Sequence, residues 1–371
     1  VTRDGHGFVR PDDAGEDVVV SAHRLGTAMN GDRLVVRIER RPPGRSREGS
    51  VIRILERART TVVGTLHEGR RVRYVTPLDV RLRRDVLVTP GGEADEEAED
   101  GQVVLVRLTS FGEGRTGPTG ELVEVIGELG DPGVDVLAVA HGYGLALDFP
   151  EDVLAAAEHA ARLGEAEEGP DRIDRTELLT FTIDPADAKD HDDALSVTRL
   201  ENGSVEVGIH IADVSHFVRP GTPVDLEAAS RGTSVYLVDR TVPMLPHILS
   251  SDVCSLHPGR ERFAVSVFVT LDQDGAVRTR RYERTVILCQ AGLAYEEAQE
   301  VLDGTGTVSP EMDEALRVLD DYARRIRERR RARGAVDFDL PEAKVILDEE
   351  GRPVDIRRRE RRSSHRLIED Y

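Results

Sequence analysis

The hydrophobic positions of the first third of the chain alternate with polar ones over short stretches, which is typical of β-strands with one buried face. These stretches end in Gly, Pro or Asp and occur in two copies within residues 1–135. Residues 8–13 (FVRPDD) match 74–79 (YVTPLD), residues 17–20 (DVVV) match 85–88 (DVLV), and residues 32–38 match 102–108. The repeat predicts two small antiparallel β-barrels, with residues 40–49, rich in Pro, Gly and Arg, as an extended linker between them.

Beyond residue 135 longer helical patterns join the strand patterns. Helices are predicted at 150–163, where proline takes the first position, and at 295–302 and 311–333. Apolar strand signals occur at 178–183 and 204–211. The expected organisation is a first β module at 1–45, a second at 46–135, a connector with a helix at 136–170 and an α+β domain at 171–371.

The composition indicates a globular chain with more than one core. Its 371 residues are 39% hydrophobic and carry a net charge of −20, and this length suffices for two or three domains. No apolar run reaches the length of a membrane span, so no membrane partner is expected. Cys254 and Cys289 fit no zinc motif and are expected in the core; with no visible secretory signal, they favour a cytoplasmic location.

Basic residues gather in three stretches despite the negative total. Residues 33–59 hold nine arginines against three glutamates, an excess of six, and arginine-rich runs follow at 324–333 and 352–366. Such stripes on an acidic chain are compatible with a path for RNA. A solvated face is the simpler alternative for each, above all for the expected helix that contains 324–333.

Candidate chemistry is concentrated in residues 182–195, TIDPADAKDHDDAL, where five carboxylates lie within ten residues: Asp184, Asp187, Asp190, Asp192 and Asp193. Carboxylates this close repel one another unless positive charge lies among them. Lys189 supplies one such charge and is one of only two lysines in the chain. Because Mg²⁺ prefers oxygen ligands, carboxylates among them, the cluster predicts a Mg²⁺ site that handles phosphodiesters.

Simpler explanations of these polar residues need to be weighed. An acidic surface loop is disfavoured because residues 178–183 and 194–197 are mostly apolar, which places the aspartates at the mouth of buried strands. An EF-hand is also disfavoured, since its glycine and closing glutamate are missing. His210, Asp213 and His216 follow a strand and offer further ligands, but a hydrogen-bonded structural histidine is the commoner outcome.

Two aromatic residues of the β modules are candidates for stacking on bases. Phe8 lies in the glycine-containing stretch Gly5–Val9, and Tyr74 occupies the matching position of the second copy. A glycine-flanked exposed aromatic suits a base-stacking platform of the cold-shock type, whereas the alternative is a core residue of a barrel without ligand.

Six motifs follow one another after the first stacking candidates: TIDPADAKDHDDAL, HIADVSHFV, RGTSVY, VPMLPHILSSDVCSL, GAVDFDLPEAKV and SHRLIEDY. In this order they resemble the RNB family of exoribonucleases, most closely its ribonuclease R branch, with ribonuclease II a near relative. The resemblance spans essentially the whole chain. It implies a mixed β and α+β fold, in which two N-terminal cold-shock-like OB-fold β-barrels precede the N-terminal part of an α+β RNB catalytic domain.

The resemblance implies a Mg²⁺-dependent hydrolytic exoribonuclease that degrades single-stranded RNA processively from the 3′ end to nucleoside 5′-monophosphates, as a monomer. The catalytic aspartates of the family match Asp184, Asp190, Asp192 and Asp193. Asp184 and Asp193 match direct metal ligands, Asp192 a ligand of a second metal or of the attacking water, and Asp190 a residue that orients an arginine or a ligand water. The resemblance assigns His191 no role.

The RNA end is held by further matching positions. The resemblance implies that Tyr236 stacks on the 3′-terminal base with Phe338 across that base, and that Tyr295 and Glu369 lie near the ribose and favour RNA over DNA. From the sequence alone, the alternative for Tyr236 is an ordinary strand aromatic, and the alternative for Phe338 and Tyr295 is a core aromatic.

The family extends beyond SHRLIEDY, with the rest of the catalytic domain, an S1 domain and an arginine that stabilises charge in the transition state. We therefore expect a fragment with little nuclease activity of its own and reduced stability. Two other functions stay open: a non-catalytic RNA-binding protein built on tandem OB-folds, and a metal-dependent phosphoesterase with a small substrate. All four matching aspartates count against the first, and the tandem barrels with their basic linker count against the second.

Overall fold

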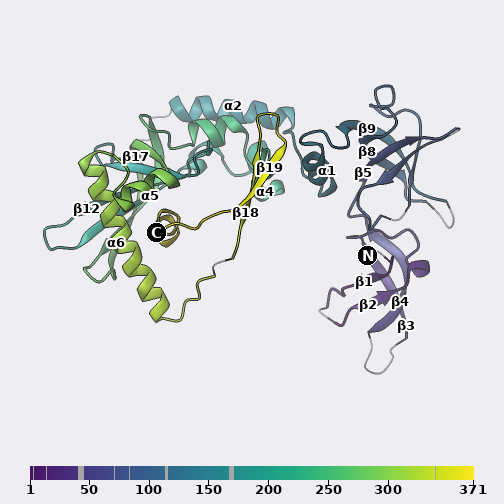
Figure 1. Cartoon of the computed structure of the whole chain (residues 1–371), viewed down its shortest axis with the longest axis horizontal. Helices are drawn as coiled ribbons and strands as arrows, with labels where there is room; N and C mark the ends of the chain where they lie inside the picture. The colour runs from purple at the N-terminus through teal and green to yellow at the C-terminus, as the bar shows by residue number, and fades with distance from the viewer. Residues whose placement is uncertain are drawn as a thin grey trace. The chain divides into compact units, whose positions relative to one another are not determined.

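The computed structural model describes residues 1–2, 4–13, 15–40, 46–70, 72–82, 84–112, 116–166, 171–338 and 340–371. The chain forms two compact units, which are described separately (Figure 1). Unit 1 comprises Val1–Leu147, Leu237–Arg240 and Leu347–Val354. Unit 2 comprises Asp148–Tyr236, Thr241–Ile346 and Asp355–Tyr371, and therefore contains the aspartate cluster.

The second β module of unit 1 is a closed five-stranded barrel in the order β5-β6-β7-β9-β8. Its strands are β5 (Thr61–Glu68), β6 (Arg73–Pro77), β7 (Val86–Val88), β8 (Gln102–Ser110) and β9 (Thr119–Glu128). Fully buried side chains such as Leu66, Val75 and Leu122 fill its interior. Closure removes the exposed strand edges, so the barrel prediction is confirmed for this module.

The first β module is a four-stranded sheet in the order β1-β2-β4-β3. Its strands are β1 (Gly7–Val9), β2 (Val18–Val20), β3 (Arg33–Arg40) and β4 (Arg47–Glu56), with a 3₁₀ turn at Ala22–Arg24. Its pairings repeat those of the barrel. The antiparallel pair β1–β2 corresponds to β6–β7, the parallel pair β2–β4 to β7–β9, and the antiparallel pair β3–β4 to β8–β9. The internal repeat in the sequence is thus a repeat of strand topology.

Two of the expected boundaries need correction. Because β4 (Arg47–Glu56) pairs with β2 and β3, the first module extends to Glu56, and the division at 45/46 was wrong. The expected linker at 40–49 ends within β4, and its residues 41–45 lie outside the described residues. Helix α1 (Val134–Gly142) buries Val134 and Ala138 with barrel residues, so the division at 135/136 cuts an element that belongs to the second module.

Unit 2 is built on a sheet in the order β10-β17-β11-β12-β13-β16. Its strands are β10 (Ile173–Asp174), β11 (Thr180–Asp184), β12 (Asp193–Arg199), β13 (Val205–Ala212), β16 (Glu261–Leu271) and β17 (Val277–Ala294). The long strand β17 pairs with β16 up to Leu288 and with β11 from Cys289 onward. Strand β17 thereby joins β16, at one end of this order, to β11, and the sheet curls back on itself.

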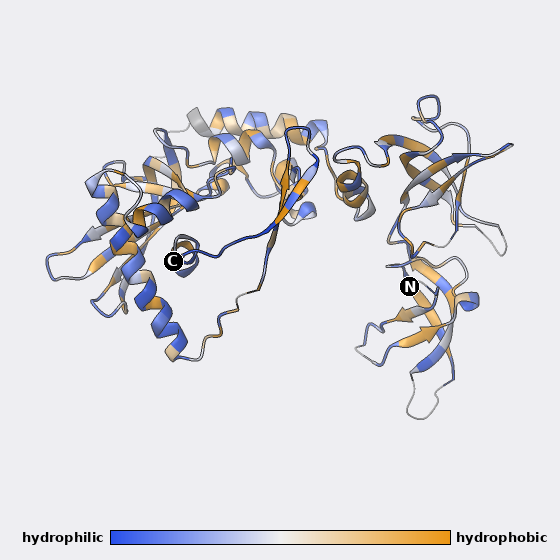
Figure 2. Cartoon of the chain, viewed as in Figure 1, coloured by the Kyte–Doolittle hydropathy of each residue, from blue (hydrophilic) through white to orange (hydrophobic). Residues whose placement is uncertain are grey.

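Three helices cover one face of this sheet: α5 (Tyr295–Asp303), α6 (Pro310–Ala332) and α7 (Ser363–Asp370). The Ser309 hydroxyl caps α6 by accepting the Met312 N–H, and Pro310 takes the first helical position. Leu316 and Leu319 of α6 are fully buried, whereas the arginine-rich C-terminal turns are hydrophilic (Figure 2). The helices predicted at 295–302 and 311–333 are therefore confirmed.

A second core of unit 2 lies under α2 (Glu151–Ala166), which confirms the helix predicted at 150–163. It includes residues of α3 (Val214–Phe217), α4 (Pro223–Arg231) and the π-helical turn Leu249–Val253. Two hairpins complete the fold, β14 (Val235–Tyr236) with β15 (Thr241–Val242), and β18 (Ala343–Leu347) with β19 (Pro353–Arg358). Within the described residues no helix is long and apolar enough to cross a membrane.

Candidate active site

The aspartate cluster lies where two neighbouring strands of unit 2 end and begin. Strand β11 ends at Asp184 and its antiparallel neighbour β12 begins at Asp193, so both carboxylates lie at the same edge of the sheet. All five residues of β11 are buried, with Phe181 and Ile183 in the core beneath α5 and α6. The expectation of aspartates at the mouth of buried strands is confirmed.

Hydrogen bonds fix two of the four aspartates. Asp184 is only 8% exposed, and its Oδ2 lies 2.7 Å from Nδ1 of His191. Tyr236, on β14, donates its hydroxyl to Oδ2 of Asp190 at 3.1 Å. The structure thus brings Tyr236 to the acidic loop from a hairpin more than forty residues further along the chain.

Electrostatic repulsion is strongest at the start of β12. Burial, followed by the charges of Asp192 and Asp184, raises the pKa of Asp193 to about 6. Partial burial also raises the pKa of Asp192, and the carboxylates of Asp184 and Asp190 add to this. Ionised carboxylates here are therefore costly, and a nearby cation would lower that cost.

The suitability of this cluster for a divalent cation follows from its donor atoms and its charge. Its side chains offer carboxylate oxygens, which hard cations prefer. Among the described residues, however, no three histidine, cysteine, aspartate or glutamate side chains are already arranged as a metal cage. The carboxylate oxygens of the cluster fit a hard cation such as Mg²⁺, which usually completes its coordination with water or substrate oxygens.

The contact between His191 and Asp184 was not predicted from the sequence. The hydrogen bond to Asp184 raises the pKa of its imidazole above the ordinary value, and the charges of Asp190 and Asp192 act in the same direction. Sequence reasoning assigned the compensating charge to Lys189, whereas the structure places the imidazole directly on a carboxylate. The available signal was a titratable residue inside the aspartate run.

A distant segment holds the backbone of the acidic loop. The Ser255 hydroxyl accepts the His191 N–H at 2.9 Å and donates to the Lys189 carbonyl at 3.3 Å. The Leu256 N–H donates to the His191 carbonyl at 2.8 Å. Ser255 and Leu256 are almost fully buried, so the loop is anchored to the protein interior.

The four RNA-end candidates of unit 2 lie in different environments. Tyr236 and Phe338 are 68% and 72% exposed, so neither is a core residue. Tyr295, at the start of α5, is half-buried and stacks on His365 of α7, with ring centroids 4.1 Å apart. Burial raises the pKa of Tyr295, with smaller contributions from the charges of Asp184 and Asp193.

Arg361 joins the remaining candidates. Its Nε donates to Glu369 Oε1 at 3.1 Å, and its Nη1 donates to Asp337 Oδ1 at 2.7 Å and to the Phe338 carbonyl at 3.4 Å. One guanidinium thereby links helix α7 to the segment that carries Phe338. Asp339 of the same motif lies outside the described residues.

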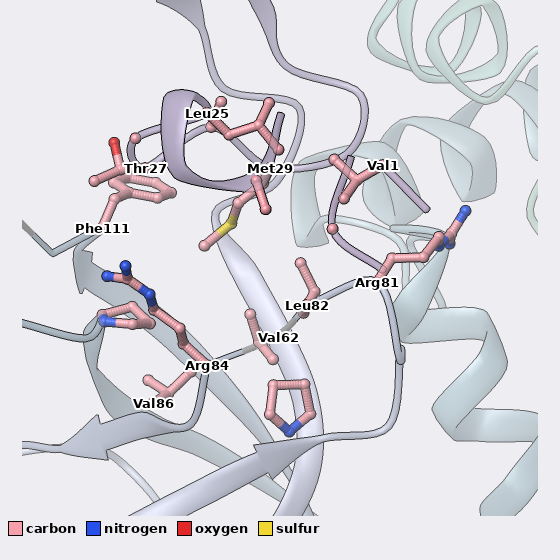
Figure 3. A pocket seen from close by; sticks show the side chains of 16 residues that line it. Val1, Leu25, Thr27, Met29, Val62, Arg81, Leu82, Arg84, Val86 and Phe111 are labelled. Atoms are coloured by element: carbon pink, nitrogen blue, oxygen red, sulfur yellow. The ribbon is translucent and has the colours of Figure 1, made fainter. Parts of the chain in front are cut away.

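The candidates in unit 1 also differ. Phe8 is 57% exposed on β1 and is available for stacking. Tyr74 stacks on His67 of the neighbouring strand β5, with centroids 5.0 Å apart. A separate cavity of about 150 Å³ in this unit is lined by Leu25, Met29, Phe111 and others, and contains none of the predicted site residues (Figure 3).

The other candidate ligands have structural partners. His210 is fully buried between Ser196 and Ser266, whose hydroxyls lie 2.9 and 2.7 Å from its ring nitrogens. Burial lowers its pKa to about 4, so it stays neutral at physiological pH. The interpretation of His210 as a structural histidine therefore accounts for its contacts, and Asp213 is paired with Arg172.

Both cysteines are buried, as expected. Burial raises the pKa of each thiol, Cys254 and Cys289, to about 12. A thiol in this state is a poor nucleophile and a poor metal ligand.

Taken together, the fold and the site define a class: an α+β domain with a carboxylate cluster at one sheet edge, preceded by two OB-type β modules. Residues 172–371, more than half of the chain, match the RNB domain, residues 74–150 match the cold shock domain, and residues 1–54 match the ribonuclease B OB domain. The chain therefore belongs to the RNB family, and the fold class predicted from the sequence is confirmed.

Similar proteins carry the name ribonuclease R. The chain is 34% identical over 342 residues to ribonuclease R of Acidithiobacillus ferrooxidans, covering 90% of this chain and 77% of that protein. It is 37% identical to ribonuclease R of Thermotoga maritima over 90% of this chain but only 47% of that protein. The solved structure of Mycoplasma genitalium RNase R in complex with ribose-methylated single-stranded RNA matches with a TM-score of 0.90 at 23% identity, over 98% of this chain and 58% of that one. The chain thus spans between about half and three quarters of these relatives.

Proposed function

We propose that the protein is a hydrolytic 3′→5′ exoribonuclease that degrades single-stranded RNA processively to nucleoside 5′-monophosphates with the help of Mg²⁺. The observation that carries the proposal is the geometry of Asp184 and Asp193 at one sheet edge, with the pKa of Asp193 raised to about 6 by burial and by its carboxylate neighbours. A site with this charge favours a cation and, through it, an anionic phosphodiester. The similarity to proteins named ribonuclease R supports the same activity.

Each aspartate has a role in this proposal. Asp184, Asp192 and Asp193 would hold the cation, whose charge would activate water and neutralise the phosphate. Asp190 accepts the Tyr236 hydroxyl and so couples the acidic loop to the residue that receives the RNA end. The protein otherwise contributes position, because in-line attack at a phosphodiester requires the reacting groups to be aligned.

The exposed aromatics receive the RNA. In the proposal Tyr236 and Phe338 stack on the 3′-terminal base, for which their high exposure leaves the rings available. Tyr295 and Glu369 favour ribose over deoxyribose through the 2′-hydroxyl. Phe8 and Tyr74 contribute to binding further from the 3′ end, Phe8 with an exposed ring and Tyr74 with a ring already stacked on His67. We also propose that the protein acts as a monomer in the cytoplasm, where its two free thiols remain reduced.

The test uses the full-length gene product and a 5′-labelled single-stranded RNA. We expect a ladder that shortens from the 3′ end in Mg²⁺, and its loss in EDTA or with Asp193→Asn. Thin-layer chromatography of a uniformly labelled RNA should show nucleoside 5′-monophosphates, whereas nucleoside diphosphates would indicate phosphate-driven cleavage. RNA binding without degradation would contradict the proposal and favour a non-catalytic RNA-binding protein, and cleavage only of a small phosphodiester would favour the phosphoesterase alternative.

A further inference from the structure

His191 lies inside the aspartate run, and its ring makes a single short contact with the most buried carboxylate of the cluster. Nδ1 is 2.7 Å from Oδ2 of Asp184, and both side chains are largely buried, with 17% and 12% of their side-chain surface exposed. The bond to Oδ2 leaves Oδ1 of Asp184 outside the contact with His191.

The position of the His191 ring is fixed from both sides. Its backbone N–H and carbonyl are held by the Ser255 hydroxyl and the Leu256 N–H. Its ring packs edge-on against His257, with centroids 5.6 Å apart, and His257 is itself placed by a 2.9 Å contact between Nε2 and the Ser251 carbonyl. An anchored donor of this kind can hold a carboxylate in one rotamer, whereas a mobile surface side chain cannot.

We propose that His191 is the positioning residue of Asp184: it holds Oδ2 and thereby orients the carboxylate for cation binding. The inference rests on the proposed cation role of the cluster and adds a residue that the family resemblance leaves without a role. Hydrogen bonds to the carboxylates that ligate a metal orient these ligands, and the loss of such a partner typically weakens metal binding by about 10- to 100-fold.

Two substitutions separate the hydrogen bond from the packing of the ring. His191→Phe keeps a ring beside His257 but removes the donor. His191→Asn removes the ring but places an amide N–H close to the position of Nδ1. We expect calorimetric titration of the full-length protein with Mn²⁺ alone, at pH 8, to show affinity reduced by roughly 10-fold or more in His191→Phe and restored to within about threefold of the wild type in His191→Asn.

His257→Phe is the matched control, because it keeps a ring against His191 and removes an imidazole whose Nε2 contacts the Ser251 carbonyl. Its affinity for Mn²⁺ should stay within about twofold of the wild type. Circular dichroism and thermal unfolding in EDTA should show all three variants folded, so that a change in affinity reports on the site.

Three outcomes would overturn the inference: unchanged Mn²⁺ affinity in His191→Phe, failure of His191→Asn to recover it, or an equal loss in His257→Phe. A ¹⁴N coupling in the electron spin echo spectrum of the Mn²⁺ complex, lost in His191→Phe, would also overturn it, since the imidazole would then be a ligand. Asp193→Asn distinguishes a failure of this inference from a failure of the proposed function. If Mn²⁺ binding depends on Asp193 and His191 but RNA is not degraded, the function fails and the role of His191 stands.

Discussion

Asp193 lowers the stability of the metal-free fold, whereas the proposed chemistry uses its carboxylate to hold a cation. Its carboxylate is partly withdrawn from water and lies beside Asp192 and Asp184, so the folded state holds its proton up to a pH of about 6, while the unfolded chain releases it near 4. Ionisation in the folded state is therefore unfavourable, and without a cation this residue destabilises the fold at neutral pH.

Asp193→Asn should accordingly stabilise the metal-free protein. A folded-state pKa that lies above the unfolded one means that stability falls as the pH rises from about 4 to about 6 and stays lower above that. The neutral amide escapes this cost, so we expect a gain of about 1–3 kcal/mol in the free energy of unfolding at pH 8 in EDTA, and no gain at pH 4. Urea denaturation at the two pH values measures both quantities.

The control is Asp187→Asn, which removes an exposed carboxylate from the same loop and should change stability by less than about 0.5 kcal/mol. Addition of Mn²⁺ should reverse the order of wild type and Asp193→Asn, because only the wild type gains stability from the cation. Equal stability of the two proteins in EDTA at pH 8 would show that the repulsion at Asp193 is relieved in another way.

Tyr236 has two separable parts, a hydroxyl on Asp190 and an exposed ring. Measured in an Asp193→Asn background that cannot degrade RNA, Tyr236→Ala should weaken binding of a short 3′-ended RNA by about 5- to 150-fold, which corresponds to the loss of about 1–3 kcal/mol of stacking. Tyr236→Phe keeps the ring and should bind within about twofold of its parent. Fluorescence anisotropy measures these affinities, with Tyr282→Ala, an equally exposed tyrosine of β17, as the control. A similar loss with Tyr282→Ala would remove the special role of Tyr236.

At the scale of single residues, the sequence predicts those features of the site that lie within one short motif. The aspartates, their spacing and the apolar residues on either side of them are all contained in fourteen consecutive residues. The contact of His191 with Asp184 is different, because it depends on how the loop between β11 and β12 folds back and on Ser255, sixty-four residues away. Nothing in the local pattern specifies that direction.

Among the elements, the central strands of unit 2 carry a buried polar row on the face opposite the α5–α6 core. The row consists of three contacts, one after another. Ser196 of β12 contacts His210 of β13 at 2.9 Å, His210 contacts Ser266 of β16 at 2.7 Å, and Ser266 contacts Thr285 of β17 at 2.6 Å. All four are nearly or fully buried, and the hydroxyls and ring nitrogens of these four residues each have a partner within the row. Polar residues in these strands are therefore satisfied within the sheet and do not need a ligand.

A buried ion pair joins the segment before β10 to the segment before α3. Arg172, just before β10, is paired with Asp213, just before α3, and the two side chains are 4% and 1% exposed. Burial alone would raise the pKa of Asp213, but the hydrogen bonds from Ser215 and Arg172 outweigh it and hold the pKa below its usual range. The contribution of this carboxylate is thus fully present above pH 4 and is lost only at lower pH.

Asp213→Asn should therefore lower the free energy of unfolding at pH 7 by about 3–5 kcal/mol, because it leaves the Arg172 charge buried without its partner. Glu314→Gln breaks the pair of Glu314 with Arg199, whose side chains are 65% and 63% exposed, and should cost no more than about 1 kcal/mol. Urea denaturation compares the two variants. Equal costs would mean that burial of the Arg172–Asp213 pair does not determine its contribution.

Element prediction succeeded where the signal is local and failed where it is not. Helices α2 and α6 follow from periodicity and a proline at the start, and α5 follows from periodicity, each within one segment of the sequence. Strand β4 was taken in part for a linker because its first residues, Arg47 to Gly49, are polar and flexible in composition. They form a strand because they pair in parallel with β2, almost thirty residues earlier, which no local pattern reveals.

On the scale of the whole molecule, the sequence repeat and the change of pattern near residue 171 already indicated two β modules followed by a different domain. The structure keeps this plan but divides the chain into two units near residue 147, since α1 packs with the barrel residues Val63 and Val103, whereas α2 packs with Phe217 and Leu249 of unit 2. Each unit therefore has hydrophobic cores of its own, and a helix belongs to the unit whose core it packs against.

Separate cores predict separate unfolding transitions. Among the described residues, the barrel core around Leu66 and Leu122 contains none of unit 2, and the core around Phe181 and Leu316 contains none of unit 1. Differential scanning calorimetry of the 371-residue chain should therefore resolve two transitions. Asp213→Asn, at its expected cost of about 3–5 kcal/mol, should lower the midpoint of one of them by about 6–20 °C, given about 2–4 °C per kcal/mol for a unit of this size, and leave the other within about 1 °C. A substitution inside the barrel, Leu122→Ala, should shift the other transition alone. A single transition that both substitutions lower would mean that the two units unfold as one cooperative structure, because the loss of either core then removes the stability of the other.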